Sequence, residues 1–449
     1  MSHPTEKRNA ACSQRLGDDG VPRSPAAQDV PRSPSDLRAA DKVSQVFHRL
    51  GGPDELTIGW TARFAGRPPT VEALRSYVQS RLSSLPGLTH RLTPNSKAPC
   101  WEPLSHVDMR RHVRVLDVVG EADWESAFRR VQLIPLPSEC HPRWDLWLIH
   151  DAATTGQFVL LFRIHHAVSD GVGLSYVAKI LCSLPQPPYP EKQATVGAGD
   201  DRMSAKAVFG IVREVTAGMW PCRVPPMFRN ATTRKRSYAV GAVPTERLRE
   251  IGRRLDAGID EVFLAAVAGA MRAVALAEGR RPRPVRILWP LSTRRISEQG
   301  LPGNFVTMAR ILLPCDDPDP LRRHQLIGRQ LTAQSSERRI QSSRWLLRLT
   351  PAPLTRLVLR RLFEGRRFPL AVTYFPLALR RPAIDGAVMT GVVGWGAPAP
   401  GQLCHLTLLR YQATCELSVV YDDAMPCGAG IPRMWKDALD ELHALACAP

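Results

Sequence analysis

The segment 158–166 opens with five apolar residues and ends in two adjacent histidines. A continuous apolar run of this length is typical of a strand that is covered on both faces. A few residues later, 172–184 has the pattern of a helix that Pro185 ends. A buried strand followed closely by a helix indicates a layered α/β fold and makes an all-coil or fibrous chain unexpected.

Helical and strand patterns alternate through both halves of the chain, which predicts an α/β sandwich of two lobes of similar size. Helices are expected over 71–85, 124–133, 204–217, 261–277 (with Asp260 as its cap), 320–367 and 431–446. Strands are expected over 113–119, 144–150, 285–290, 306–313 and several segments within 369–423. Residues 1–38 are rich in Pro, Ser and mixed charge, and we expect a disordered tail there.

The two histidines are His165 and His166. Neighbouring side chains of a strand point to opposite faces, so both cannot serve one function. Phe162 and Ile164 share a face with His166, while His165 lies on the other face. One histidine can meet a substrate and the other must be structural, but the alternation does not say which.

Asp170 follows His166 by four residues, and Gly171 permits a tight turn before the helix. A carboxylate in this place can anchor the loop. A neutral imidazole can take a proton from a hydroxyl, amine or thiol, which typically accelerates a reaction about 10²–10⁴-fold. Other interpretations stay open: a satisfied core histidine, Asp170 as the N-cap of the helix, or a metal site. The opposed faces disfavour joint ligation by His165 and His166, so no metal is expected.

The bulk composition narrows the class of protein further. The formal charge of +18 favours anionic partners such as nucleic acid, acidic lipid, the phosphates of coenzyme A or an acidic carrier protein. Ten scattered cysteines without a CxxC pair argue against a disulfide framework and a zinc ribbon. No signal peptide is visible, and the most apolar segment, 262–277, is shorter than the ~20 residues of a membrane span. A cytoplasmic protein is therefore expected.

Residues 165–171 match the HHxxxDG signature, and this stretch resembles the coenzyme A-dependent acyltransferase superfamily of chloramphenicol acetyltransferase and peptide-synthetase condensation domains. Within it, the chain is most similar to the bacterial wax ester synthase/diacylglycerol acyltransferases. Further matching segments lie in the usual order and span about residues 40–445. They are 83–88 with 91–92, the PLW-type strand 142–149, the PxSxR strand 289–294, the LGN segment 302–306, and 312–314.

The resemblance implies two chloramphenicol-acetyltransferase-like lobes that form a V with a central tunnel. The expected division is a tail at 1–38, an N-terminal lobe at 39–184, a linker and crossover at 185–235, and a C-terminal lobe at 236–449. The implied substrates are acyl-coenzyme A and an alcohol such as a long-chain alcohol or diacylglycerol, with no cofactor. Direct attack on the thioester is implied, without an acyl-enzyme.

The resemblance also implies the roles of the site residues. His166 is the general base and His165 is supportive. Asp170 orients the loop through an ion pair with Arg294. Gly171 allows close approach of the acyl group, and Asn304 shapes the site from the second lobe.

The second lobe departs from the family pattern, which leaves the substrate open. Tyr374 stands where asparagine is usual, and Arg410 stands where serine is common. One alternative is an enzyme of specialised metabolism that uses a carrier-protein thioester or an amine acceptor. Another is an inactive homologue that binds lipid or a partner.

The region 320–370 holds twelve arginines against two glutamates. Its basic amphipathic helices suit an anionic membrane or lipid-droplet surface, or an acyl carrier protein. A solvated helix face over the core is the alternative. Nucleic-acid binding is not expected, because no recognised nucleic-acid fold accompanies the charge.

Overall fold

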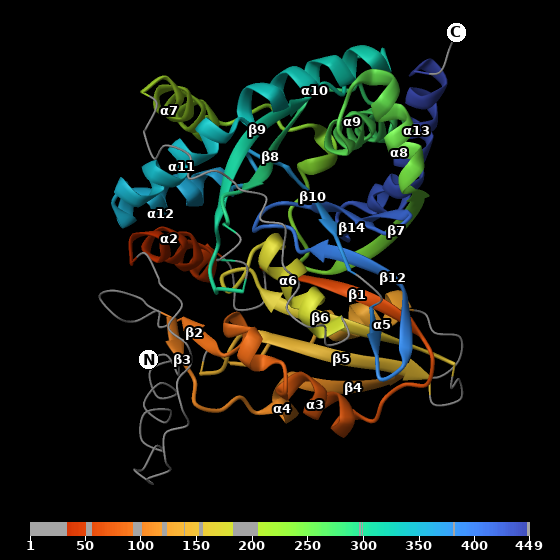
Figure 1. The fold of residues 1–449 in the computed structure, drawn as a ribbon. Helices are drawn as coiled ribbons and strands as arrows, with labels where there is room; N and C mark the ends of the chain where they lie inside the picture. The colour runs from red at the N-terminus through yellow and green to blue at the C-terminus, as the bar shows by residue number, and fades with distance from the viewer. Residues whose placement is uncertain are drawn as a thin grey trace, which may run out of the picture.

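The computed structural model describes residues 34–50, 56–92, 101–118, 124–138, 140–151, 156–182, 205–295, 298, 300–379 and 382–446. Two six-stranded sheets with their helices make up the two lobes (Figure 1). The linker expected at 185–200 lies outside the described residues, as does the tail as far as residue 33. Helix α2 (Pro34–Leu50) begins inside the segment 1–38, where a disordered tail was expected.

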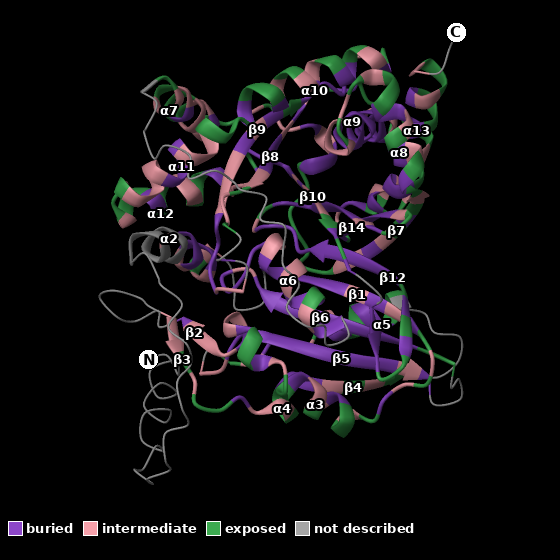
Figure 2. Cartoon of the chain, in the orientation of Figure 1, coloured by how far each residue is buried: buried purple, intermediate pink, exposed green. Residues whose placement is uncertain are grey.

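The first sheet contains the histidine-bearing strand at its centre. Its order is β11 (Ala383–Ile384), β12 (Ala387–Gly396), β1 (Thr57–Ala65), β6 (Gln157–His165), β5 (Trp144–Asp151) and β4 (Val113–Val118). Strands β5 and β6 are buried along nearly their whole length (Figure 2), which agrees with the apolar run that predicted a covered strand. A separate pair, β2 (His90–Leu92) and β3 (Trp101–Pro103), lies at the edge of this lobe.

The second sheet faces the first across the middle of the molecule (Figure 1). Its order is β7 (Arg236–Pro244), β14 (Thr414–Asp422), β13 (Cys404–Tyr411), β10 (Leu370–Leu377), β8 (Val285–Ser292) and β9 (Val306–Leu313). Strand β10 runs parallel to β8 and β13, and the other neighbours are antiparallel.

Strand β12 crosses between the lobes. It follows β10 and precedes β13 in the chain, yet it pairs with β1 of the first sheet from Ile58↔Gly396 to Ala65↔Val388. Residues 383–396 therefore complete the N-terminal lobe although they fall inside the range expected for the C-terminal lobe. A single boundary in the chain does not separate the two sheets.

Most helices lie near their expected positions. In the first lobe they are α3 (Val71–Gln79), α4 (Met109–His112), α5 (Trp124–Gln132) and α6 (Gly171–Cys182). In the second lobe they are α7 (Ala205–Met219), α8 (Thr245–Leu255), α9 (Ile259–Ala277), α10 (Pro320–Gln334), α11 (Glu337–Leu349), α12 (Ala352–Leu362) and α13 (Ile431–Ala446). Helix α9 is buried against the second sheet and α13.

Two local expectations are wrong for identifiable reasons. The helix expected over 71–85 ends at Gln79, because the Ser80 hydroxyl donates to the Tyr77 carbonyl and Pro86 opens a separate 3-10 turn. Asp260 does not cap α9, because Gly258 occupies the N-cap position. Asp260 lies in the first turn instead, where its charge still favours the helix N-terminus.

Helix α2 ties the N-terminal side of the chain to the second lobe, where it packs on α11 and α12. The Lys42 ammonium donates to the carbonyl oxygens of Leu347, Arg348 and Thr350 at 3.2, 2.9 and 2.7 Å. These carbonyls end α11 and lack helical partners, so a cation stabilises them. The pairing holds α2, and with it Phe47, beside the histidine loop.

Candidate active site

The loop at 166–170 joins strand β6 to helix α6. The backbone N–H of His165 donates to the Arg143 carbonyl at 2.9 Å, and that of His166 donates to the Leu56 carbonyl at 2.7 Å. The next loop contact comes from the second lobe, where Gly303 N–H donates to the Val168 carbonyl at 2.8 Å. The loop is therefore clamped from both lobes by main-chain bonds.

Asn304 determines which nitrogen of His166 carries the proton. His166 Nδ1 lies 2.9 Å from Asn304 Oδ1, and Asn304 Nδ2 lies 2.7 Å from the His166 carbonyl oxygen. A carbonyl oxygen only accepts, so the atom that faces it must be the amide nitrogen. The amide oxygen then faces Nδ1, which must donate. A neutral His166 consequently keeps the lone pair on Nε2, where a base needs it.

The surroundings favour the neutral form of His166. Burial lowers its pKa from the ordinary value, and the Asp170 charge and the Asn304 hydrogen bond only partly oppose this. Phe47 stacks on the imidazole at 4.6 Å between ring centroids and fixes the ring plane. The imidazole is thus oriented and unprotonated near pH 7.

His165 lies on the opposite face of the strand. Its Nδ1 accepts the backbone N–H of Ala167 at 3.1 Å, and the residue is buried. Burial, together with the charges of Arg143 and His48, lowers the pKa of His165 well below its ordinary value. It does not line the central cavity, whereas His166 does. Its contacts are those of a residue that supports the loop.

Asp170 is the carboxylate that joins the loop to the second lobe. Its Oδ2 accepts Arg294 Nη2 at 2.8 Å and the backbone N–H of Phe305 at 2.9 Å, while Oδ1 accepts the backbone N–H of Gly173 at 2.9 Å. Burial alone would raise the pKa of Asp170, but the Arg294 charge and these hydrogen bonds hold it below its ordinary value. The ion pair implied by the resemblance and the N-cap inferred from local pattern therefore coexist.

Arg294 is fixed on several sides, and its side chain is fully buried. Besides Asp170, it donates to the carbonyl oxygens of Glu298, Leu301 and Gly303. These carbonyls belong to the segment that precedes Asn304. One guanidinium thus positions both the carboxylate of one loop and the amide of the other.

Gly171 opens α6 with an ordinary backbone conformation, so the tight turn does not require glycine there. A Cβ at this position would meet only Phe375, at 3.9 Å. Gly173 is more constrained, because a Cβ there would lie 2.2 Å from Ser169 Oγ. Gly171 does line the cavity, and a side chain on it would reduce the space beside His166.

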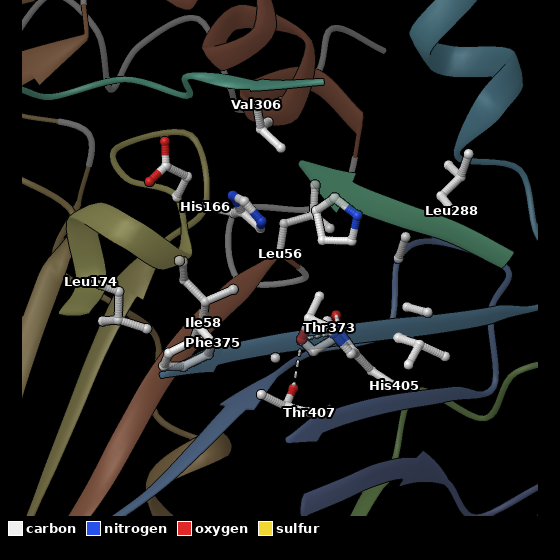
Figure 3. A pocket seen from close by; sticks show the side chains of 18 of the residues that line it. Leu56, Ile58, His166, Leu174, Leu288, Val306, Thr373, Phe375, His405 and Thr407 are labelled. Atoms are coloured by element: carbon white, nitrogen blue, oxygen red, sulfur yellow. Dashed lines mark hydrogen bonds between the residues drawn. The ribbon is translucent and has the colours of Figure 1, made fainter. Parts of the chain in front are cut away.

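A cavity of about 190 Å³ lies between the two sheets beside His166 (Figure 3). Its walls come from both lobes and are mainly apolar. They include Phe47, Ile58, Leu174, Leu288, Met308 and Phe375. The cavity suits a substrate with hydrocarbon parts, since apolar walls gain free energy when they cover apolar surface.

Comparison with known proteins points to one group of acyltransferases. Residues 55–220 match the wax ester synthase/diacylglycerol acyltransferase catalytic domain. The chain is an acyltransferase, and over these residues it is similar to this family. A Mycobacterium tuberculosis protein provisionally named a diacylglycerol O-acyltransferase is 24% identical over 78% of this chain and 83% of its own length. A second one from that organism is 26% identical over 67% and 72% of the two chains.

Solved structures agree on the fold of this acyltransferase. The wax ester synthase/diacylglycerol acyltransferase from Marinobacter aquaeolei VT8 has a TM-score of 0.62 at 18% identity and covers 90% of this chain and 98% of that one. The starter condensation domain of rhizomide synthetase has a TM-score of 0.61 at 15% identity and covers 92% and 94%. The expected two-lobe α/β fold is confirmed.

In the described part of the acyltransferase, no group of three or more His, Cys, Asp or Glu side chains is placed to hold a metal ion. None of the helices described is both long and apolar enough to cross a membrane.

Sequence reasoning missed several residues that line the same cavity of this acyltransferase. Among them are Phe47, which stacks on His166, and Thr373, His405 and Thr407 on the second sheet. His405 and Thr407 are two residues apart in an alternating strand, so they share a face, and that signal was available in the sequence. Nothing local in the sequence placed Phe47 against His166.

Proposed function

We propose that the enzyme transfers a fatty acyl group from acyl-coenzyme A to the hydroxyl of an alcohol, with His166 as general base. Nε2 of His166 takes the hydroxyl proton while the acceptor oxygen attacks the thioester carbonyl. The tetrahedral intermediate then expels the coenzyme A thiolate, which recovers the proton from Nε2. The products are an ester and free coenzyme A, so atoms and charges balance.

The pairing of His166 with Asn304 carries this proposal. A general base needs an unprotonated nitrogen that faces the substrate, and it needs a fixed tautomer. Asn304 Oδ1 accepts from Nδ1 and leaves Nε2 as the basic atom of a ring that lines the cavity. The lowered pKa of His166 keeps that nitrogen free near neutral pH.

The choice of a fatty acyl group rests on the walls of the cavity. Leu56, Ile58 and Leu174 from the first lobe and Leu288 and Val306 from the second line the cavity, and Phe375 lies beside Ile58 (Figure 3). Such walls give no favourable partner to a charged or strongly polar chain. Long-chain alcohols and diacylglycerol are the acceptors that fit this surface best.

Helices α11 and α12 support one further part of the proposal, contact with an anionic lipid surface. Leu349, Leu354 and Leu357 are exposed on them, and they lie among the arginines of the basic region. Apolar side chains beside cationic ones suit the boundary of a negatively charged membrane. Flotation with vesicles of anionic and of neutral lipid tests this; equal recovery with both would count against it.

The catalytic test is direct. His166→Ala is expected to lower kcat for ester formation from hexadecanoyl-coenzyme A and hexadecanol by about 10²–10⁴-fold. His106→Ala is the matched control, since His106 is exposed and is not among the residues that line the cavity. A His166→Ala protein with normal turnover would falsify the assigned role. Mass spectrometry of the products with amine and carrier-bound substrates beside the alcohol tests the alternative chemistries.

A further inference from the structure

A second polar cluster faces the cavity from the side of the second sheet. His405 and Thr407 lie on β13, and Thr373 is the register partner of Thr407 on β10. All three line the cavity together with His166 (Figure 3). The reaction proposed above uses none of them.

The hydrogen bonds of this cluster leave it with spare acceptors. His405 Nδ1 lies 3.2 Å from the Ala397 carbonyl oxygen, which only accepts, so Nδ1 donates and Nε2 is an acceptor. Thr373 Oγ1 lies 3.3 Å from His405 Nε2 and 3.2 Å from Thr407 Oγ1. The cluster has two donors, the hydroxyl protons of Thr373 and Thr407. Its acceptors are His405 Nε2 and the two hydroxyl oxygens, each of which has two lone pairs. Some acceptor lone pairs therefore remain unused whichever way the hydroxyls turn.

The cluster is also neutral. Burial lowers the pKa of His405 to about 4, opposed by the hydrogen bond to the Ala397 carbonyl and assisted by the positive form of His166. A neutral imidazole with spare acceptors does not attract a carboxylate or a phosphate. The group it can hold is a neutral hydrogen-bond donor, which means a hydroxyl or an amide N–H.

The fold reserves space for this imidazole. A Cβ on Gly396 would lie 2.4 Å from His405 Cε1, so only glycine allows β12 to pass so close. Thr373 keeps part of its surface accessible although β10 is an interior strand. In walls that are otherwise mostly apolar, polar groups fix the orientation of a ligand.

We propose that His405, Thr373 and Thr407 form a subsite that binds a neutral hydroxyl or amide N–H of a substrate while the reacting group lies at His166. This inference rests on the proposed acyl transfer. Two substrate groups have the required chemistry. One is a second hydroxyl on the acceptor alcohol, and the other is an amide N–H of the pantetheine arm of acyl-coenzyme A.

Kinetics of Thr373→Val test the subsite, because valine removes the hydroxyl at nearly constant shape. If the acceptor is held, kcat/KM for a 1,2-diol relative to a 1-alcohol of the same length should fall about 10-fold. If the pantetheine arm is held, KM for acyl-coenzyme A should rise about 10-fold instead. Thr390→Val is the control, since Thr390 is exposed on β12 outside the cavity lining. If Thr373→Val changes neither the diol preference nor the KM for acyl-coenzyme A, the proposal is overturned.

Thr373→Ser keeps the hydroxyl and should restore wild-type values, which a merely packing role of the threonine methyl would not allow. Thr407→Val provides a second test if Thr373→Val fails to fold. It removes the neighbouring hydroxyl, and its expected change has the same direction and a smaller size.

Calorimetric binding separates this inference from the proposed function. The wild type could esterify no alcohol and still bind the diol or coenzyme A more tightly than Thr373→Val does. This result would contradict acyl transfer to alcohols and support the subsite. If turnover is normal and the wild type and Thr373→Val bind equally well, the subsite is contradicted and the acyl transfer is supported. Absence of both turnover and binding overturns both.

Discussion

Asn304 and His166 bind each other through two bonds in opposite directions: the amide oxygen faces the ring nitrogen Nδ1 at 2.9 Å, and the amide nitrogen faces the His166 carbonyl at 2.7 Å. With the amide reversed, its oxygen would face the His166 carbonyl oxygen, and the bond to that carbonyl would be lost. Asn304 Nδ2 also lies 3.2 Å from Ser44 Oγ, which adds a third constraint from α2. Two lobes and the N-terminal helix therefore meet at one amide group.

Asn304→Leu tests this positional role. Leucine has a similar volume and cannot accept from Nδ1, so the tautomer with a free Nε2 loses its support. We expect kcat to fall about 10²-fold with little change in KM, within the range of general-base assistance. Steady-state kinetics with the proposed substrates measure both constants. A loss confined to KM would mean that Asn304 binds substrate and does not orient the base.

Removal of the Arg294 guanidinium should destabilise the protein. Arg294→Met leaves the buried Asp170 carboxylate without its cation, and breaking a buried pair in this way costs about 3–5 kcal/mol. Urea denaturation measures the loss. The double variant Arg294→Met with Asp170→Asn removes the unpaired charge and should recover part of it. If the double variant loses more stability than the two single variants lose together, the unpaired Asp170 charge is not the cause of the loss.

The dependence of the rate on pH follows from the pKa of His166. The neutral form is active, and burial lowers the pKa of His166 below the ordinary 6.5. Consequently, kcat/KM should be constant between pH 7 and 8 and should decrease as the pH falls through the lowered pKa. Asp170 stays ionised over that range, since its pKa is also lowered. An activity that keeps rising above pH 7 would point to a different base.

Elements with a strong local pattern could be predicted from the sequence. The apolar run before His165 predicted strand β6, and the bounds of β9 and α13 agree with those expected. The pairing of Asp170 with Arg294 came from the family resemblance, because the two residues are 124 positions apart. The alternation of side chains along the strand showed that only one of the two histidines can face a substrate. It did not show which one.

Contacts between segments that are distant in the chain could not be predicted from the sequence. The crossing of β12 to β1 depends on pairing across more than 300 positions, which no local pattern encodes. Phe47 reaches His166 because α2 packs on α11 and α12, where Lys42 binds the end of α11. Both contacts arise from tertiary packing, and local propensity had placed part of α2 in a disordered tail.

The apolar walls of the cavity can be tested by filling it. Leu174 is a buried residue of α6 that lines the cavity, and tryptophan in its place adds bulk where a hydrocarbon chain is proposed to lie. Leu174→Trp should lower kcat/KM for a hexadecanoyl group relative to an octanoyl group by about 10-fold, because a longer chain no longer fits. Overpacking should cost about 1–3 kcal/mol of stability. The same comparison with hexadecanol and octanol tells which chain passes Leu174. Leu312→Trp, at an exposed site on β9, is the control. Unchanged preference for both chains would mean that hydrocarbon does not occupy this part of the cavity.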